Sequence, residues 1–148
     1  MLRTVFGLFL AAAGYMIQEP VQPSPARTIT IRLLDSRSGK PLVSNDVEIV
    51  IERHTRHIVY AKTSADGIAI AQIPSETSEL SVYAQQNGWY LYRCDFAKGK
   101  ELPFYDLNQI LNHGIAANNG CSRRMAPAKP GEITLFLRTQ TFWEKMRI

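Results

Sequence analysis

The feature that most constrains this chain is a succession of short segments with the two-residue alternation of β-strands, each bounded by turn-forming residues. β-Branched and other apolar side chains recur at every second position in several of them, which places one face of each strand against a core. Seven segments have strand character: residues 28–35, 47–51, 56–63, 68–70, 80–84, 89–96 and 133–137. The sequence therefore predicts an all-β fold, a seven-stranded antiparallel β-sandwich.

The apolar side chains of these segments also predict the core of the sandwich. Bulky aliphatic residues on the inner faces of two sheets pack together and exclude water. We expect the following side chains to be buried: Ile31, Leu33, Ile49, Ile51, Val82, Leu135 and Leu137. Asp66-Gly67, between the third and fourth segments, predicts a tight hairpin turn, because such turns need a residue with positive φ.

Two segments depart from the β pattern. Asp106 stands where a helix N-cap belongs, apolar residues follow it at helical spacing, and Gly114 lies just past the expected end of the helix. This short helix opens a long irregular loop that continues to Gly131. Thr141 and Glu144 have the spacing of a capping box, which predicts a short helical turn at the C-terminus.

The N-terminus has the pattern of a secretory signal peptide. Arg3 gives a positive start, residues 5–13 are uncharged and mostly apolar, and residues 11–14 are the small residues that a signal peptidase requires. We expect residues 1–13 to be the signal peptide, with cleavage after Ala13 or Gly14. A buried N-terminal helix of the domain and an uncleaved anchor extended to Ile17 are the alternatives, although the anchor is too short to cross a bilayer.

The rest of the chain divides into a tether, one domain and a tail. Residues 14–26 contain three prolines within six residues, which favours an extended tether over a helix or a central strand. The sandwich domain is expected over residues 27–140, and residues 141–148 form a C-terminal tail. We expect an exported protein, periplasmic or extracellular, with no membrane span after cleavage.

The two cysteines, Cys94 and Cys121, are expected to form a disulfide. Export places them in an oxidising compartment, and two cysteines allow only one pairing. The bond would hold the long irregular loop to the strand that contains Cys94. The alternative is a pair of free, buried thiols, which behave as small apolar side chains.

Three segments resemble the carboxypeptidase regulatory-like domain family. Residues 31–42 have a strand that ends in Asp, followed by a turn with Gly-Lys-Pro; residues 63–69 are similar to the family's Thr-Asp-x-x-Gly element; and residues 80–84 precede Gly88-Trp89, where the family has a Gly-Tyr-like pair. In this chain Asp66 abuts Gly67 directly, which departs from the family pattern. The resemblance covers residues 28–92 and extends more loosely to residues 132–138.

This resemblance implies a transthyretin-like Greek-key sandwich that serves as an accessory module. The catalytic zinc residues of carboxypeptidases belong to a different domain, so no peptidase activity is implied for this chain. Residues 110–121 and 130–144 lie outside the general pattern of the family.

The sequence contains no recognisable catalytic or metal-binding motif. A Gly-x-Ser-x-Gly elbow and a phosphate-binding Gly-Lys-Ser/Thr loop are both absent, and the carboxylates are scattered. His54 and His57 suit a metal site only on a helix, whereas this segment is expected at a strand junction, where their side chains point to opposite faces. His113 is expected at a helix C-terminus, where the helix dipole favours an imidazolium. We therefore expect neither an enzyme, nor a metal, nor a cofactor.

The aromatic residues Trp89, Tyr90 and Tyr92, with Tyr83 nearby, are the candidate ligand site. Together they offer a platform on which sugar rings stack. The alternative is core packing, because strand alternation puts Tyr90 and Tyr92 on one face and Trp89 and Leu91 on the other, and at least one set belongs to the core.

These observations favour a non-enzymatic module that binds an envelope or extracellular protein whose identity the sequence does not give. A small-ligand or carbohydrate-binding module using the aromatic platform is the second hypothesis. Lys and Arg number 17 against 13 Asp and Glu, a net charge of +4 that falls short of a nucleic-acid-binding balance. We accordingly expect no nucleic-acid partner, and the oligomeric state stays open.

Overall fold

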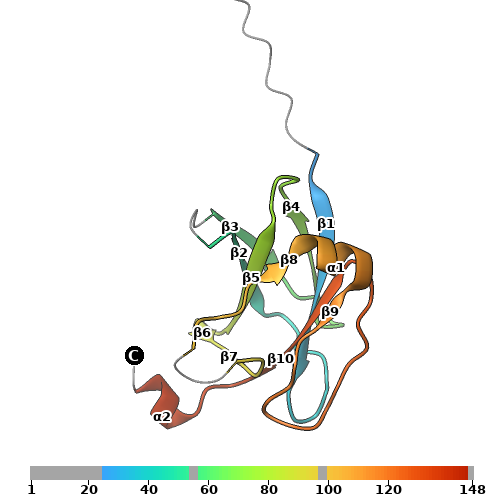
Figure 1. The fold of residues 1–148 in the computed structure, drawn as a ribbon. Coiled ribbons are helices and arrows are strands. Elements are labelled where there is room, and N and C mark those ends of the chain that lie inside the picture. The colour runs from blue at the N-terminus through green and yellow to red at the C-terminus, as the bar shows by residue number, and fades with distance from the viewer. Residues whose placement is uncertain (1–24, 54–56, 97–99, 147–148) are drawn as a thin grey trace, which may run out of the picture.

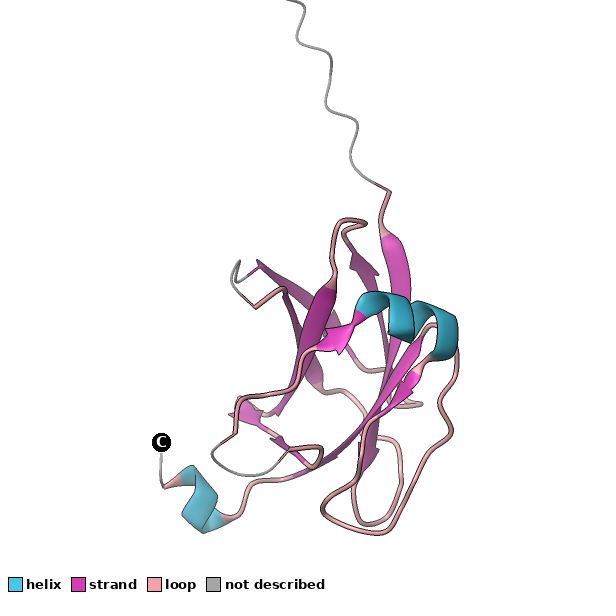
Figure 2. Cartoon of the chain, in the orientation of Figure 1, coloured by secondary structure: helices cyan, strands magenta, loops and turns pink. Residues whose placement is uncertain are grey.

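The computed structural model describes residues 25–53, 57–96 and 100–146, which form two β-sheets and two short helices (Figures 1 and 2). The predicted signal peptide and most of the predicted tether lie outside the described residues. In chain order the elements are β1 (Arg27–Asp35), β2 (Asp46–Ile51), β3 (His57–Lys62), β4 (Ile68–Ile73), β5 (Glu79–Gln86), β6 (Trp89–Tyr90), β7 (Tyr92–Arg93), β8 (Tyr105–Asp106), α1 (Leu107–His113), β9 (Ile115–Ala116), β10 (Glu132–Arg138) and α2 (Phe142–Lys145).

The first sheet has the strand order β4-β1-β10-β7, and β9 also pairs with β10. β1 and β10 run parallel, with Leu33 opposite Leu135, and β9 is also parallel to β10. The expectation of wholly antiparallel pairing is therefore wrong at the centre of this sheet. The reason is topological, because the chain visits both sheets several times between β1 and β10 and returns in the direction in which it set out.

The second sheet has the order β3-β2-β5-β6, and β8 also pairs with β5. All pairings in it are antiparallel. The predicted number of seven strands is not confirmed, because the described residues form six strands of six residues or more and four strands of two residues.

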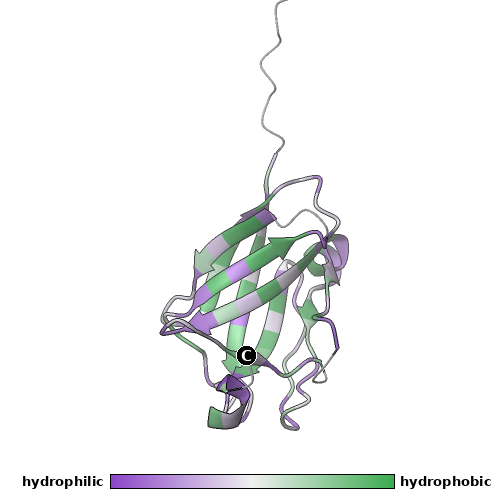
Figure 3. Ribbon diagram, turned by 90° about the vertical axis from the view of Figure 1, so that its left-hand side faces the viewer, coloured by the Kyte–Doolittle hydropathy of each residue, from purple (hydrophilic) through white to green (hydrophobic). Residues whose placement is uncertain are grey.

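The core lies between the inner faces of the two sheets. All seven side chains predicted for it are buried, and so are Leu107 and Ile110 of α1. Hydrophobic residues, green in Figure 3, are concentrated along the strands. The alternation read from the sequence therefore identifies inward positions correctly on β1, β2, β5 and β10. On the edge strands β3 and β4 it does not, because the large side chains Tyr60 and Ile70 are exposed.

Two predictions about chain path are wrong. The turn at Asp66-Gly67 does form, and Gly67 has φ +69°, but it is no hairpin, because β3 and β4 belong to different sheets. Residues 89–96 are not one strand either: β6 pairs with β5 in the second sheet, whereas β7 pairs with β10 in the first. Between them Leu91 is buried, and its N–H donates to the carbonyl of Ala84 at 2.8 Å, so the chain turns inward at this point.

Both predicted helical segments are present. The Asp106 side chain accepts a hydrogen bond from the Gln109 N–H at 2.7 Å, and Gly114 ends α1 with φ +73°. At the C-terminus the Thr141 N–H donates to the Glu144 carboxylate at 2.8 Å, as expected at the start of α2. Among the described residues, neither helix is long and apolar enough to span a membrane.

Candidate binding surface

The three residues of the predicted aromatic platform separate onto two strands. Trp89 and Tyr90 are on β6 and both are exposed, whereas Tyr92 is on β7 and half-buried. The expectation that strand alternation buries at least one of these sets is wrong for Trp89 and Tyr90. It assumed one continuous strand, and the inward turn at Leu91 breaks the alternation.

Tyr92 is engaged by other side chains of the protein. The guanidinium of Arg138 lies over its ring at 4.0 Å from the centroid, and the ring of Phe96 lies nearly parallel to it at 6.1 Å. Contacts of this kind combine cation–π and stacking attraction. Tyr92 therefore links β7 to the end of β10 and offers less ring surface to a ligand than Trp89 or Tyr90 does.

Tyr90 is held in place by a polar contact across the second sheet. Its hydroxyl donates to one oxygen of Glu48 at 3.0 Å, and the side-chain amide of Gln85 donates to the other at 2.6 Å. The rings of Tyr83 and Tyr90 meet edge to face, 6.0 Å apart. Partial burial and the hydrogen bond to Glu48 both raise the pKa of Tyr90, so the phenol is neutral at physiological pH.

Two adjoining pockets open beside these aromatics. One, of about 200 Å³, is mostly apolar and is lined by Tyr83, Tyr90, Leu91, Tyr92, Arg93, Phe96, Leu102 and Gln140. The other, of about 170 Å³, is lined by Gln86, Asn87, Trp89, Tyr90, Leu91, Thr139, Gln140 and Lys145. Tyr90, Leu91 and Gln140 belong to both pockets, so β6 and the segment that follows β10 form one continuous surface.

A C-terminal hook, defined as residues 141–146, stands beside this surface. Arg138 binds Glu144 through two nitrogens, at 2.8 and 2.7 Å, and the Nζ of Lys145 lies 4.9 Å from the centre of the Trp89 ring. Its apolar side chains nevertheless face solvent: Phe142 is 67% exposed, Trp143 72% and Met146 66%. Figure 1 shows α2 projecting from the sandwich. The hook is thus an ordered element without a buried side chain of its own.

Arg93 forms a buried polar network at the open edge of β5. Its side chain is 2% exposed and donates to Asp95 through Nε at 3.0 Å, to the Ser81 hydroxyl at 3.0 Å and to the Val82 carbonyl at 2.8 Å. Tyr105 also donates to Asp95, and burial with this hydrogen bond raises the pKa of Tyr105. Because β7 belongs to the first sheet and β5 to the second, Arg93 joins the two sheets where neither β6 nor β8 pairs with β5.

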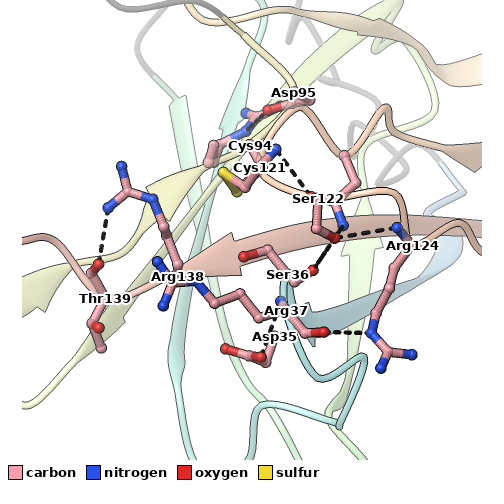
Figure 4. The surroundings of a disulfide bond; sticks show 12 residues. Asp35, Ser36, Arg37, Cys94, Asp95, Cys121, Ser122, Arg124, Arg138 and Thr139 are labelled. Carbon is pink, nitrogen blue, oxygen red and sulfur yellow. Dashed lines mark hydrogen bonds and ion pairs between the residues drawn. A yellow bond between two sulfur atoms is a disulfide. The ribbon is translucent and has the colours of Figure 1, made fainter.

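The predicted disulfide is present. Cys94 and Cys121 are bonded, with their Cα atoms 5.3 Å apart, and the Gly120 N–H donates to the Cys94 carbonyl at 2.7 Å. Figure 4 shows the loop beyond the bond reaching the turn after β1, where Ser122 contacts the Ser36 carbonyl and Arg124 contacts that of Arg37. Asn119 donates to the same Ser36 carbonyl at 2.9 Å. The disulfide and these hydrogen bonds therefore fasten the long loop to the segment after β7 and to the turn after β1.

The histidines do not assemble a metal site in the part of the chain that is described. His57 and His113 are both exposed, and His54 lies outside the described residues. No group of three or more potential metal-binding side chains occurs within residues 25–53, 57–96 and 100–146.

Several residues of this surface could not be recognised from the sequence. Nothing in the sequence connects Arg138 with Glu144, and neither Glu48 nor Tyr60 belongs to a recognisable motif. Alternation places Glu48 on the outward face of β2, whereas the outward position of Tyr60 follows from its pairing with Glu48 in the sheet. Comparison with known proteins adds no information: no family model, no curated protein and no solved structure matches the chain.

Proposed function

We propose that this chain is an exported, non-enzymatic β-sandwich module that binds another protein of the cell envelope or extracellular space through its C-terminal hook. The observation that carries the proposal is the exposure of Phe142, Trp143 and Met146 on an element that is fixed in place. Large exposed apolar side chains grouped together are a mark of interaction sites.

The chemistry of the hook suits a protein contact. Aromatic side chains supply much of the energy of protein interfaces, and Trp is prominent among the residues that dominate it. The ion pair between Arg138 and Glu144 holds the helix in its shape before any partner arrives, which lowers the ordering cost of binding.

The export and family proposals rest on separate observations. A disulfide between Cys94 and Cys121 suits an oxidising compartment, as the predicted signal peptide does. We also propose a transthyretin-like Greek-key arrangement, on the strength of the family-like segments. In the segment of residues 31–42 the strand ends at Asp35, whose carboxylate accepts from the N–H groups of Arg37 and Ser38 and so orders the turn before Gly39.

A non-enzymatic role is supported by the use that the protein makes of its buried charged groups. Arg93 and Asp95 pair with each other, and Tyr105 donates to the same carboxylate. Such a network stabilises the join between the sheets, and the charges in it are already satisfied by one another.

The experiment is an affinity capture from an extract of the cell envelope, with the full chain as bait. The account expects one discrete protein to be retained by the wild-type chain and lost with the Phe142→Ala/Trp143→Ala variant. Met125→Ala is the matched control, because Met125 is an exposed apolar residue of the long loop. Equal retention by the double variant, or loss with the control, contradicts the proposal.

A further inference from the structure

The outer face of the second sheet carries a row of tyrosines with polar groups between them. In the register of this sheet, Glu48 on β2 lies opposite Tyr60 on β3 and opposite Tyr83 on β5, and Gln85 lies opposite Tyr90 on β6. We call these five residues the tyrosine row. Since neighbouring strands are about 4.8 Å apart, a row across four strands extends over roughly 14 Å.

The row is accessible to a ligand. Tyr60, on the edge strand β3, is 70% exposed, and Tyr90 is 46% exposed. Tyr83 and Glu48 are half-buried between them. The rings belong to the sheet face itself, so an extended ligand can lie across the strands without entering a cavity.

The polar groups of the row decide what kind of ligand suits it. Glu48 accepts one hydrogen bond on each oxygen, from Gln85 and from Tyr90, and a carboxylate has about four acceptor sites, so further hydroxyl groups can bind it. The side-chain amide of Gln85 has a second N–H that can donate to a ligand, and the phenol of Tyr60 has a hydroxyl that can hydrogen-bond to it. An apolar partner would remove water from the Glu48 carboxylate without offering hydrogen bonds in its place, and burying a charge in this way costs free energy.

A sugar ring can both stack on the tyrosine rings and hydrogen-bond to the polar groups between them. The axial C–H groups of a pyranose form an apolar face that packs on an aromatic ring, and the hydroxyl groups around the ring hydrogen-bond to carboxylates and amides. A polyanionic chain is disfavoured, because it would bring like charge to Glu48.

We propose that the tyrosine row binds a neutral polysaccharide. This site is distinct from the hook and does not depend on the proposed protein contact, since its residues lie on β2, β3, β5 and β6. It also revises the predicted aromatic platform: Tyr83 and Tyr90 stay in the ligand site and Tyr60 joins it. Trp89 lies outside the row, and Tyr92 serves to hold the C-terminal segment.

The test is retention of the purified full chain on insoluble cellulose, chitin and mannan, followed by titration with oligosaccharides of the polymer that retains it. The account expects binding to one or more of these polymers, a loss of about tenfold with Tyr60→Ala, and a smaller loss with Glu48→Gln. Ile70→Ala is the matched control, because Ile70 is 65% exposed on the edge strand of the other sheet.

Circular dichroism and thermal unfolding of each variant establish that the fold is kept. Tyr60 packs little of its surface against the protein, so its removal leaves the core intact. Failure of the wild-type chain to bind any of the three polymers overturns the proposal, and so does equal binding by Tyr60→Ala and the wild-type chain. The hook variant Phe142→Ala/Trp143→Ala is expected to bind the polysaccharide normally, which separates this site from the protein contact.

Discussion

At the scale of single residues, backbone geometry is most constraining where α1 ends. Gly114 has φ +73°, and a Cβ added there would lie 1.9 Å from the Lys129 carbonyl oxygen. Gly131 has the nearly identical φ of +76°, but a Cβ there would meet no atom within 4 Å. The two glycines therefore separate the cost of an unusual φ from the cost of close contact.

Substitution of each glycine by alanine is expected to give different losses of stability. Gly131→Ala should lower the free energy of unfolding by roughly 1–2 kcal/mol, because an L-residue is strained at positive φ. Gly114→Ala should cost roughly 1–3 kcal/mol more, because the loop backbone at Lys129 must also move. Urea unfolding of both variants measures the difference. Equal losses of stability would contradict the close contact between Gly114 and the backbone of Lys129.

The buried charge of Arg93 is the second constraint at this scale. Replacing Arg93 by Met leaves Asp95, whose side chain is 4% exposed, without its ion-pair partner. We expect a loss of roughly 3–5 kcal/mol, as for other buried pairs broken on one side. The double variant Arg93→Met/Asp95→Asn should be more stable than Arg93→Met alone. Additive losses in chemical denaturation would mean that the two side chains are not coupled in this way.

At the scale of elements, the long loop between α1 and β10 depends on the disulfide. The bond closes a loop of 27 residues, for which the chain-entropy model gives about 3.5 kcal/mol. The variant Cys94→Ser/Cys121→Ser should lose about that much stability while keeping both sheets. Hydrogen exchange should then increase in residues 117–126 before the β10 amides are affected, and uniform exchange across the chain would argue against a local role for the bond.

The stability of the hook depends on pH. Hydrogen bonds from Arg138 and from Thr141 lower the pKa of Glu144 to about 2, below its ordinary value of 4.5. A depressed folded-state pKa means that this carboxylate stabilises the folded hook above about pH 4.5 and loses that effect as the pH falls toward 2. Glu132, paired with Arg32, also has a lowered pKa and adds to the same acid dependence of the whole domain.

Tryptophan fluorescence and NMR of Trp143 against pH measure the hook separately. The account predicts a change in the Trp143 environment between about pH 4.5 and 2, and no such transition in Glu144→Gln. Because the pair is partly exposed, high salt should reduce the effect. A Trp143 signal that titrates identically in Glu144→Gln would contradict the assignment.

At the scale of the whole molecule, the two-residue alternation predicts two packed sheets. It does not predict the order in which the chain runs through them. Ile49, Val82 and Leu135 could be assigned to the core because inward positions repeat with period two. The parallel pairing of β1 with β10 could not be predicted, since it depends on how many times the chain changes sheets. Leu91 likewise looks like any strand residue, and only its packing shows where β6 ends and β7 begins.

The binding surface was predictable only in part for the same reason. Trp89 and Tyr90 stood out as aromatics of one segment, but the partners of Tyr90 come from strands that are distant in the sequence. Glu48 lies 42 residues before Tyr90, and the register that joins them is a property of the sheet. Similarly, the helical spacing of Thr141 and Glu144 predicted α2, whereas the role of Arg138 in fixing it needed the structure.

The central claim is that the fixed, exposed aromatics of the hook contact a protein partner outside the cytoplasm. Its most direct test is photo-crosslinking in living cells, with benzoylphenylalanine in place of Trp143 in the full chain and, as a control, in place of Ile70. The account predicts a discrete crosslinked adduct from position 143, with the same protein that affinity capture retains, and none from position 70. No adduct at position 143, or the same adduct from both positions, would contradict it.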